Sequence, residues 1–104
     1  MNRDELLSRA KAALDGAFGD RLRGVVLYGS EARGEAGPDS DVDLLVLLDE
    51  VEHYAEDIRT CIEALYPLSE ELDRRISPRP IPQRQYERTE CPLSRAVRRE
   101  GIPA

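Results

Sequence analysis

The 104-residue chain carries 21 Asp and Glu side chains against 15 Lys and Arg, which gives a formal net charge of -6. This length fits one domain, which we expect to span residues 1–104, and 40% hydrophobic residues supply one modest core. The acidic balance excludes a free-standing nucleic-acid binder, because such proteins need positive potential along the phosphates. It does not exclude a nucleotide, since Mg²⁺ can stand between acidic side chains and phosphates.

The apolar runs and the cysteine spacing predict the cellular location of the protein. No apolar run approaches the ~20 residues that a membrane span needs, and the first ten residues lack the apolar core of a signal peptide. The two cysteines, Cys61 and Cys91, have no partner at metal spacing and are too few for a disulfide framework. We therefore expect a cytoplasmic protein with free thiols and no membrane contact.

The first half of the chain predicts one helix and two strands. Apolar residues recur at helical spacing over Arg3–Phe18, which predicts an amphipathic helix. A β-branched run between glycines predicts a strand over Gly24–Tyr28. The stretch Gly29–Ser40 contains Gly and Pro and predicts a structured loop, with one helical turn near Glu31. The most apolar run of the chain, Asp41–Leu48, predicts a strand that is buried on both faces.

The second half predicts a helix and a third strand. An apolar stripe over His53–Leu65 predicts an amphipathic helix, and Pro67 is expected to close it. A third strand is expected over Glu71–Ser77, because Pro78 and Pro80 then break the chain.

The tail predicts two short helices, over Gln83–Arg88 and Pro92–Arg99, with Gly101 as a terminator. The overall order is helix, strand, loop, strand, helix and strand. This order argues for a single α/β domain with a small mixed β-sheet flanked by helices.

The chemically informative stretch is Gly29–Gly34 followed by Ser40–Val46. A strand that ends in Gly29-Ser30 presents bare backbone N–H groups and a hydroxyl, which suit an anion. Asp41 and Asp43 lie two apart on a strand, so both carboxylates leave the same face. Neighbouring acids repel each other unless a cation lies between them, and Mg²⁺ prefers such oxygen ligands. A phosphate cradle beside a Mg²⁺ pair indicates phosphoryl or nucleotidyl transfer.

These two segments resemble the signature of the DNA polymerase β-like nucleotidyltransferase superfamily, in which Gly-Ser is followed after roughly ten residues by Asp-x-Asp. The closer pattern, Gly-Ser-x-Ala-Arg-Gly and then Ser-Asp-x-Asp-Leu, resembles the minimal members of that superfamily, the MNT domains. The match runs from Tyr28 to Val46, and a weaker likeness continues through Ile76-Ser77-Pro78 into the tail. The resemblance implies a polymerase β-like nucleotidyltransferase fold.

The resemblance also assigns roles to the motif residues. It implies that the backbone and hydroxyl of the loop contact the triphosphate of ATP and that the acids hold Mg²⁺; these residues are Gly29, Ser30 and Ser40 for the nucleotide, and Asp41 and Asp43 for the metal. Arg33 would orient the loop or touch a phosphate, although an ion pair with Glu31, Glu35 or Asp39 is an equal alternative.

The family also uses a third catalytic and metal-binding carboxylate on a later strand. Asp73 is the candidate here, and Glu71 is the weaker alternative. Asp73 lies outside the apolar strand expected around such an acid, and an exposed ion pair with Arg74 or Arg75 is the competing interpretation. A domain with two of the three acids would bind a nucleotide and catalyse poorly or not at all.

Short bacterial and archaeal MNT proteins act as antitoxins of type VII toxin–antitoxin pairs, and they transfer AMP from ATP to a tyrosine of an all-helical HEPN-type toxin. The resemblance implies this activity here, with the HEPN-type protein as acceptor and partner and a homo- or hetero-oligomer completing the site. The alternatives are a catalytically silent antitoxin that neutralises its partner by binding alone and, less strongly, a nucleotidyltransferase for small molecules such as aminoglycosides.

Overall fold

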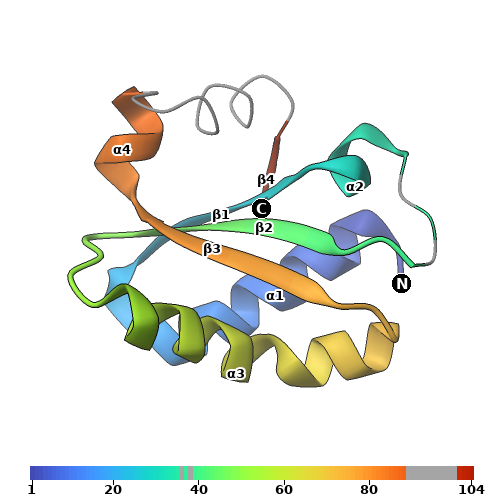
Figure 1. Cartoon of the computed structure of the whole chain (residues 1–104), viewed down its shortest axis with the longest axis horizontal. Coiled ribbons are helices and arrows are strands. Elements are labelled where there is room, and N and C mark those ends of the chain that lie inside the picture. Colours follow the sequence, from blue (N-terminus) through green and yellow to red (C-terminus); the bar gives the residue numbers. More distant parts are fainter. Residues whose placement is uncertain (36, 38, 89–100) are drawn as a thin grey trace.

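The computed structural model describes residues 1–35, 37, 39–88 and 101–104. The elements are α1 (Arg3–Phe18), the 3₁₀ turn η1 (Gly19–Arg21), β1 (Leu22–Tyr28), α2 (Ser30–Arg33), β2 (Val42–Leu48), α3 (Tyr54–Leu72), β3 (Ile76–Pro82), α4 (Gln83–Arg88) and β4 (Ile102–Pro103). The strands form one sheet in the order β3-β2-β1-β4 (Figure 1). Strand β1 is antiparallel to β2 and β4, whereas β2 is parallel to β3. The predicted small mixed sheet with flanking helices is confirmed.

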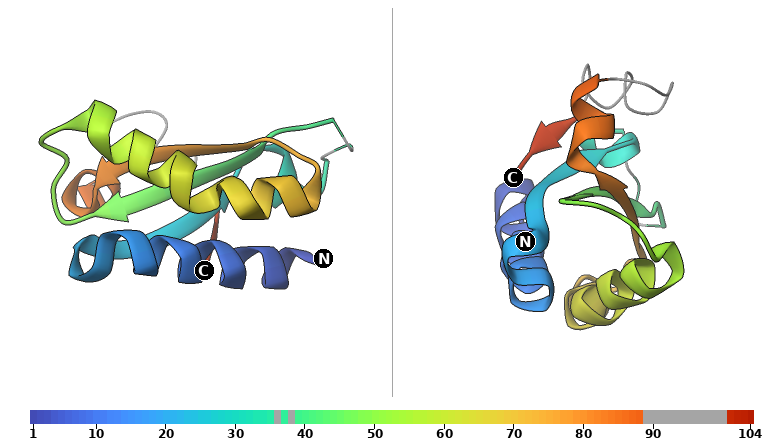
Figure 2. Two further views of the ribbon diagram at one scale, coloured as in Figure 1. Left: turned by 90° about the horizontal axis from the view of Figure 1, so that it is seen from below. Right: turned by 90° about the vertical axis from the view of Figure 1, so that its left-hand side faces the viewer.

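Helices α1 and α3 lie side by side on one face of the sheet (Figure 2). Alternate residues of the strands meet them there in the main core, among them Val25, Leu27, Leu44 and Val46. The intervening residues of β2 face the opposite side, where they pack in a smaller cluster with Val26, Ile81 and Tyr86. Strand β2 is therefore buried on both faces, as its continuous apolar run predicts.

Helix α1 has the predicted boundaries. Asn2 caps its start, because its side chain accepts a hydrogen bond from the backbone N–H of Glu5 at 2.8 Å. The helix ends at Gly19, which has a φ of 60° that glycine adopts without strain. The helical turn α2 and the short helix α4 also lie where the sequence predicts them.

The prediction that Pro67 closes the second long helix is wrong. Helix α3 continues through Pro67 to Leu72, so the helix is one long element rather than His53–Leu65. Proline removes one backbone hydrogen bond, which costs about 3 kcal/mol in a helix interior. Here Pro67 lies on the exposed side, whereas Leu68 is buried and Leu72 packs on the core. Burial of these leucines offsets the lost hydrogen bond and carries the helix onward.

The predicted bounds of the third strand are also wrong. Strand β3 begins at Ile76 and runs through both expected breaks to Pro82. It is an edge strand, and Val42 N–H donates to the carbonyl of Arg75 at 2.9 Å. In a parallel ladder, alternate residues turn their N–H groups toward the neighbouring strand. That alternation turns the nitrogens of the prolines at 78, 80 and 82 to the outer edge, where no N–H group is needed.

Strand β4 was not predicted from the sequence. Ile102 pairs with Leu27 and Pro103 with Val26, which extends the sheet beyond β1. The predicted helix over Pro92–Arg99 and the second cysteine, Cys91, lie outside the described residues. The other cysteine, Cys61, is free and buried in the core, as expected. Within the described ranges, no helix is both long and apolar enough to cross a membrane.

Candidate functional site

The face of the sheet opposite α1 and α3 carries a row of polar side chains at one end. The strand register places Asp43 of β2 between Tyr28 of β1 and Ser77 of β3. Residues that pair across a sheet leave the same face, so these three side chains form one row. In the next row, two residues along, Arg79 lies beside Leu45. The smaller apolar cluster covers the rest of this face, and Tyr28 packs against it, so the polar row borders that cluster.

Gly29 brings the loop after β1 against the carboxylate of Asp43. Its φ is 77°, and a Cβ atom added there would collide with Oδ2 of Asp43 and lie 3.3 Å from its Cγ. Both the backbone conformation and the lack of space therefore require glycine. Because no side chain stands between them, the backbone of the loop and the Asp43 carboxylate face one another directly.

The turn that follows Gly29 is closed by its own hydrogen bonds. Arg33 N–H donates to the carbonyl of Gly29 at 3.2 Å, and Glu35 N–H donates to that of Ser30 at 2.9 Å. The first N–H groups of such a turn have no acceptor within it. Together with the Ser30 hydroxyl, these donors are suited to an anion that lies beside Asp43.

Arg74 holds this loop from the turn between α3 and β3. Its guanidinium forms a two-point ion pair with Glu31 of α2, at 3.0 and 3.2 Å, and donates two hydrogen bonds to the carbonyl of Ser40, at 3.1 and 3.0 Å. The side chains of Arg74 and Glu31 are only 16% and 18% exposed. Ser40 closes a turn of its own, because its hydroxyl accepts from Gly37 N–H at 3.0 Å.

The two aspartates of the motif repel each other. Burial raises the pKa of Asp43, the neighbouring charge of Asp41 raises it further, and Arg33 lowers it. Neither carboxylate forms an ion pair within the part of the chain that the structure describes. Two adjacent carboxylates that form no ion pair among the described residues fit a hard divalent cation such as Mg²⁺, which accepts few protein ligands and completes its shell with water and phosphate oxygens.

The structure does not bring Asp73 or Glu71 to this pair. Asp73 ends α3 as an exposed residue with a φ of 52°, and Glu71 pairs with Arg9 of α1, with one of its two hydrogen bonds 2.8 Å long. Among the described residues, no three His, Cys, Asp or Glu side chains form a group suited to a metal ion. The place beside Asp43 on β3 belongs to Ser77.

Arg33 forms the ion pair that was expected as one alternative, and its contact with a phosphate stays a prediction. It forms an exposed ion pair with Glu35 at 3.3 Å, and its charge also acts on Asp43. Ser77, Arg79 and the contacts of Arg74 with Glu31 and Ser40 were not predicted from the sequence as parts of the site. The one indication was the pair Arg74 and Arg75 within the predicted third strand, where apolar residues would be expected.

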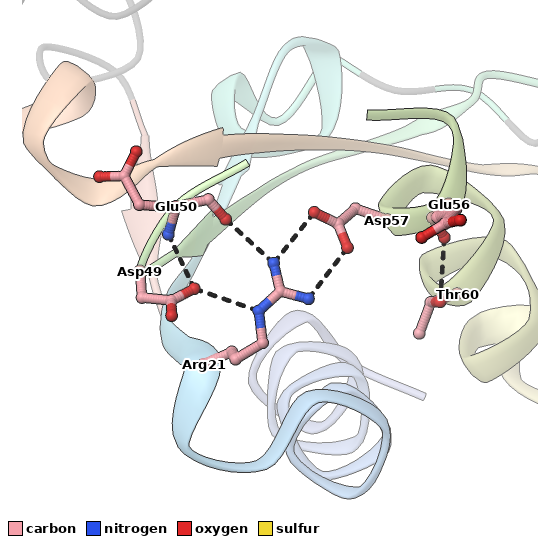
Figure 3. Close-up of polar contacts among 6 residues, drawn as sticks. All are labelled: Arg21, Asp49, Glu50, Glu56, Asp57 and Thr60. Carbon is pink, nitrogen blue, oxygen red and sulfur yellow. Dashed lines mark hydrogen bonds and ion pairs between the residues drawn. The ribbon is translucent and has the colours of Figure 1, made fainter. Parts of the chain in front are cut away.

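A second polar cluster lies at the other end of β2 (Figure 3). Arg21 forms two 3.0 Å hydrogen bonds with the carboxylate of Asp57, which is only 6% exposed, and a third at 3.2 Å with Asp49. Its guanidinium also donates to the carbonyl of Glu50 at 3.0 Å. These acids are neutralised internally, so this cluster joins η1, β2 and α3 and offers no open carboxylate pair.

Comparison with known proteins places this geometry in a family. The family model described as a nucleotidyltransferase domain matches residues 7–97. Comparison with curated protein sequences gives no match. Among solved structures, a candidate minimal nucleotidyltransferase is 32% identical, with a TM-score of 0.63 and coverage of 100% of this chain and 97% of that one.

Two other solved structures are similar. A toxin–antitoxin structure with AMP-PNP is 21% identical, with a TM-score of 0.65 over 92% of this chain and 69% of that one, and this likeness shows the fold alone. A spectinomycin adenyltransferase from Enterococcus faecialis, solved with ATP and spectinomycin, is 25% identical, with a TM-score of 0.61 over 81% of this chain and 36% of that one. The family model covers most of the sequence, and the 32% identical structure matches it over its whole length. The chain therefore belongs to the nucleotidyltransferase domain family.

Proposed function

We propose that the chain transfers AMP from ATP, with Mg²⁺, to a protein hydroxyl, namely a tyrosine of a HEPN-type toxin. It would act in the cytoplasm as the antitoxin of a type VII pair, in a hetero-oligomer with that partner. The observation that carries the proposal is the approach of Gly29 to Asp43, which sets anion-binding backbone against the repelling pair Asp41 and Asp43. Structures of similar fold include toxin–antitoxin complexes, one of them with an ATP analogue.

In the proposed reaction, the nucleotide phosphates bind on the β1 side of Asp43 and the acceptor hydroxyl approaches on the β3 side. Asp41 and Asp43 would hold the metal, which supplies positive charge to the phosphates when bound. The N–H groups of the turn after Gly29 and the Ser30 hydroxyl would bind the β- and γ-phosphates on the β1 side. The acceptor oxygen then bonds to the α-phosphorus as pyrophosphate leaves, and its proton passes to solvent. Because attack is in line with the leaving group, the acceptor must approach from the β3 side, where Ser77 and Arg79 lie.

The test is intact mass spectrometry of the partner. The purified chain is mixed with ATP, Mg²⁺ and the helical protein encoded beside it, and the partner is then weighed. A gain of one or more AMP units on the wild-type chain, absent with Asp41→Asn, supports the proposal. Undiminished transfer by Asp41→Asn or Asp43→Asn would remove the mechanism.

A second candidate is a catalytically silent antitoxin that works by binding alone. Ser77 favours it, because a residue without a carboxylate stands beside Asp43 on β3 and no third acid joins the pair among the described side chains. Neutralisation of the toxin that survives in Asp41→Asn would support binding over catalysis. Ser77→Asp separates the two further, since a third carboxylate should increase transfer by an active enzyme and leave a purely occluding antitoxin unchanged.

A further inference from the structure

Helix α3 exposes a stripe of large apolar side chains. Tyr54, Ile58, Ile62 and Tyr66 are spaced four residues apart and therefore share one side of the helix. Tyr54, Ile62 and Tyr66 are 50%, 51% and 59% exposed, and they are three of the four large hydrophobic residues exposed in the described structure. A contiguous apolar stripe of this kind marks a surface that another molecule covers.

The stripe opens into a groove between α3 and the edge strand β3, which run alongside each other (Figures 1 and 2). Ile58, Ile62 and Tyr66 line the helical wall, and Ser77 and Pro78 line the strand wall. Ser77 is also the β3 neighbour of Asp43. Ser77 thus stands at the edge of the sheet, where the groove on the α3 face meets the opposite face that carries the candidate site.

The edge of the groove does not admit an added β-strand. The prolines at 78, 80 and 82 occupy the alternate positions of β3 whose nitrogens point outward, so the edge lacks the donors that strand pairing requires. An occupant must therefore dock through its side chains. An amphipathic helix, with apolar residues at three- and four-residue spacing, suits such a groove.

The charges beside the stripe indicate the polarity of that helix. Glu56, Glu63 and Glu70 are exposed and lie seven residues apart along α3. Two cations lie near them: Arg59 on the same helix, and Arg75, which lines the strand end of the groove. Tyr66 hydrogen-bonds to Glu70, which shows that this acidic row adjoins the stripe. A second copy of the chain would bring the same three glutamates and a net charge of -6. A partner helix with basic residues along one flank complements the row instead.

We propose that the groove between α3 and β3 is the docking surface for the acceptor protein, and that it receives an amphipathic helix with a basic flank. The inference rests on the proposed function, because docking there holds the acceptor at the β3 edge of the sheet, next to Ser77, from which its hydroxyl would reach Asp43 on the opposite face. It adds the location of the partner and the chemistry by which it is recognised.

The test uses the full chain and a defined probe. The probe is a fluorescein-labelled amphipathic helical peptide of about 20 residues with a leucine stripe and a lysine flank, compared with the same peptide carrying glutamate on that flank. Fluorescence anisotropy should show micromolar binding of the basic peptide and at least about tenfold weaker binding of the acidic one. Absent binding of the basic peptide, or equal binding of both, overturns the proposal.

Surface variants locate the binding. Ile62→Arg should weaken binding of the basic peptide about tenfold or more, whereas Ala17→Arg, an exposed position on α1, should not change it. The double variant Glu63→Lys, Glu70→Lys leaves the apolar stripe intact and should shift the preference toward the acidic peptide. Binding that is equally strong in Ile62→Arg refutes the location, provided that circular dichroism shows a folded variant.

The remaining outcomes separate this inference from the proposed function. Asp43→Asn should bind the basic peptide as tightly as the wild type while losing AMP transfer. If Ile62→Arg still transfers AMP to the partner at the wild-type rate, the docking surface is wrong and the function stands. If Ile62→Arg weakens peptide binding but the wild-type chain and all variants transfer no AMP, the enzyme proposal fails and the docking surface stands. Sedimentation that shows a dimer of the chain, broken by Ile62→Arg, would assign the groove to a second copy instead.

Discussion

The two ends of strand β2 carry acidic groups in opposite electrostatic states. At the beginning, Asp41 and Asp43 face each other's charge, and burial together with Asp41 raises the pKa of Asp43. Just after its end, the N–H of Glu50 and the guanidinium of Arg21 lower the pKa of Asp49. Arg21 also neutralises the buried Asp57. The acids at one end thus pair with Arg21, whereas the two aspartates at the other end repel each other and form no ion pair among the described residues.

This contrast separates structural from functional acids in a chain that has 21 acidic residues. An acid that has an internal cation stabilises the fold, and removing it should cost stability. An acid that is held beside another acid weakens the fold slightly, and it is retained for what it binds. The predictions below test this division, beginning with the largest expected effect.

Asp43→Asn should lower AMP transfer by on the order of a hundredfold to a thousandfold, because the proposed metal ligand next to the reacting phosphate is lost. The variant should be at least as stable as the wild type, since like-charge repulsion with Asp41 is removed. Transfer is measured by intact mass over time, and stability by urea denaturation. A variant that is clearly less stable than the wild type would show that Asp43 also serves the fold.

Arg21→Ala should lower the free energy of unfolding by about 2–3 kcal/mol, because it leaves the buried Asp57 without a partner. We place the loss below that of a fully buried pair, since the Arg21 side chain is 41% exposed. Asp57→Asn in the Arg21→Ala background should recover part of the loss in a double-mutant cycle. Transfer by the folded fraction should stay near the wild-type rate.

Gly29→Ala should lower stability by about 1–2 kcal/mol, through a left-handed backbone position and a clash with Asp43. It should also weaken nucleotide binding, because the loop must move away from the carboxylate. Gly16→Ala in α1 is the matched control: an added Cβ meets nothing within 4 Å there, so about 1 kcal/mol of stabilisation is expected. Calorimetry with ATP and thermal unfolding measure both effects.

The smallest effect is the difference between two titrations in the metal-free chain. NMR of the side-chain carboxyl carbons should place the pKa of Asp43 above the ordinary value of 3.8 and that of Asp49 below it. For Asp49, the stabilisation is present above the ordinary pKa and is lost as the pH falls through the lower folded value. For Asp43 the sign is reversed: ionisation disfavours the fold, and the penalty is relieved as the pH falls through the raised value. Equal pKa values for Asp43 and Asp49 would contradict the electrostatic difference between the two ends of β2.

The fold and the motif were largely accessible from the sequence, because both rest on local patterns. The helix Arg3–Phe18 and the buried strand after Asp41 follow from apolar spacing within a few residues. The errors all concern rules whose outcome depends on distant neighbours. A proline such as Pro67 ends a helix unless burial of the next turn offsets the lost hydrogen bond. A proline such as Pro78 ends a strand unless the strand lies at the edge of its sheet.

One part of the site and one structural ion pair could not be predicted, for the same reason. The place of Ser77 beside Asp43 depends on the register of two strands that are separated by a long helix. Arg21 and Asp57 are 36 residues apart, and no local spacing reveals their pairing. The roles of Asp41 and Asp43 were predicted from their own pattern and are tested by the variants above.

The contacts of Arg74 with Glu31 and Ser40 lower the conformational entropy that nucleotide binding would otherwise remove from the loop. A glycine-rich loop that sampled many conformations would lose them when it closes on a triphosphate, and affinity would fall accordingly. The contacts of Arg74 with Glu31 and Ser40 fix the loop from both of its ends before any ligand arrives. The conformational entropy of the described residues at both ends of the loop is thus lost during folding, and the free energy of their contacts with a nucleotide would go into affinity.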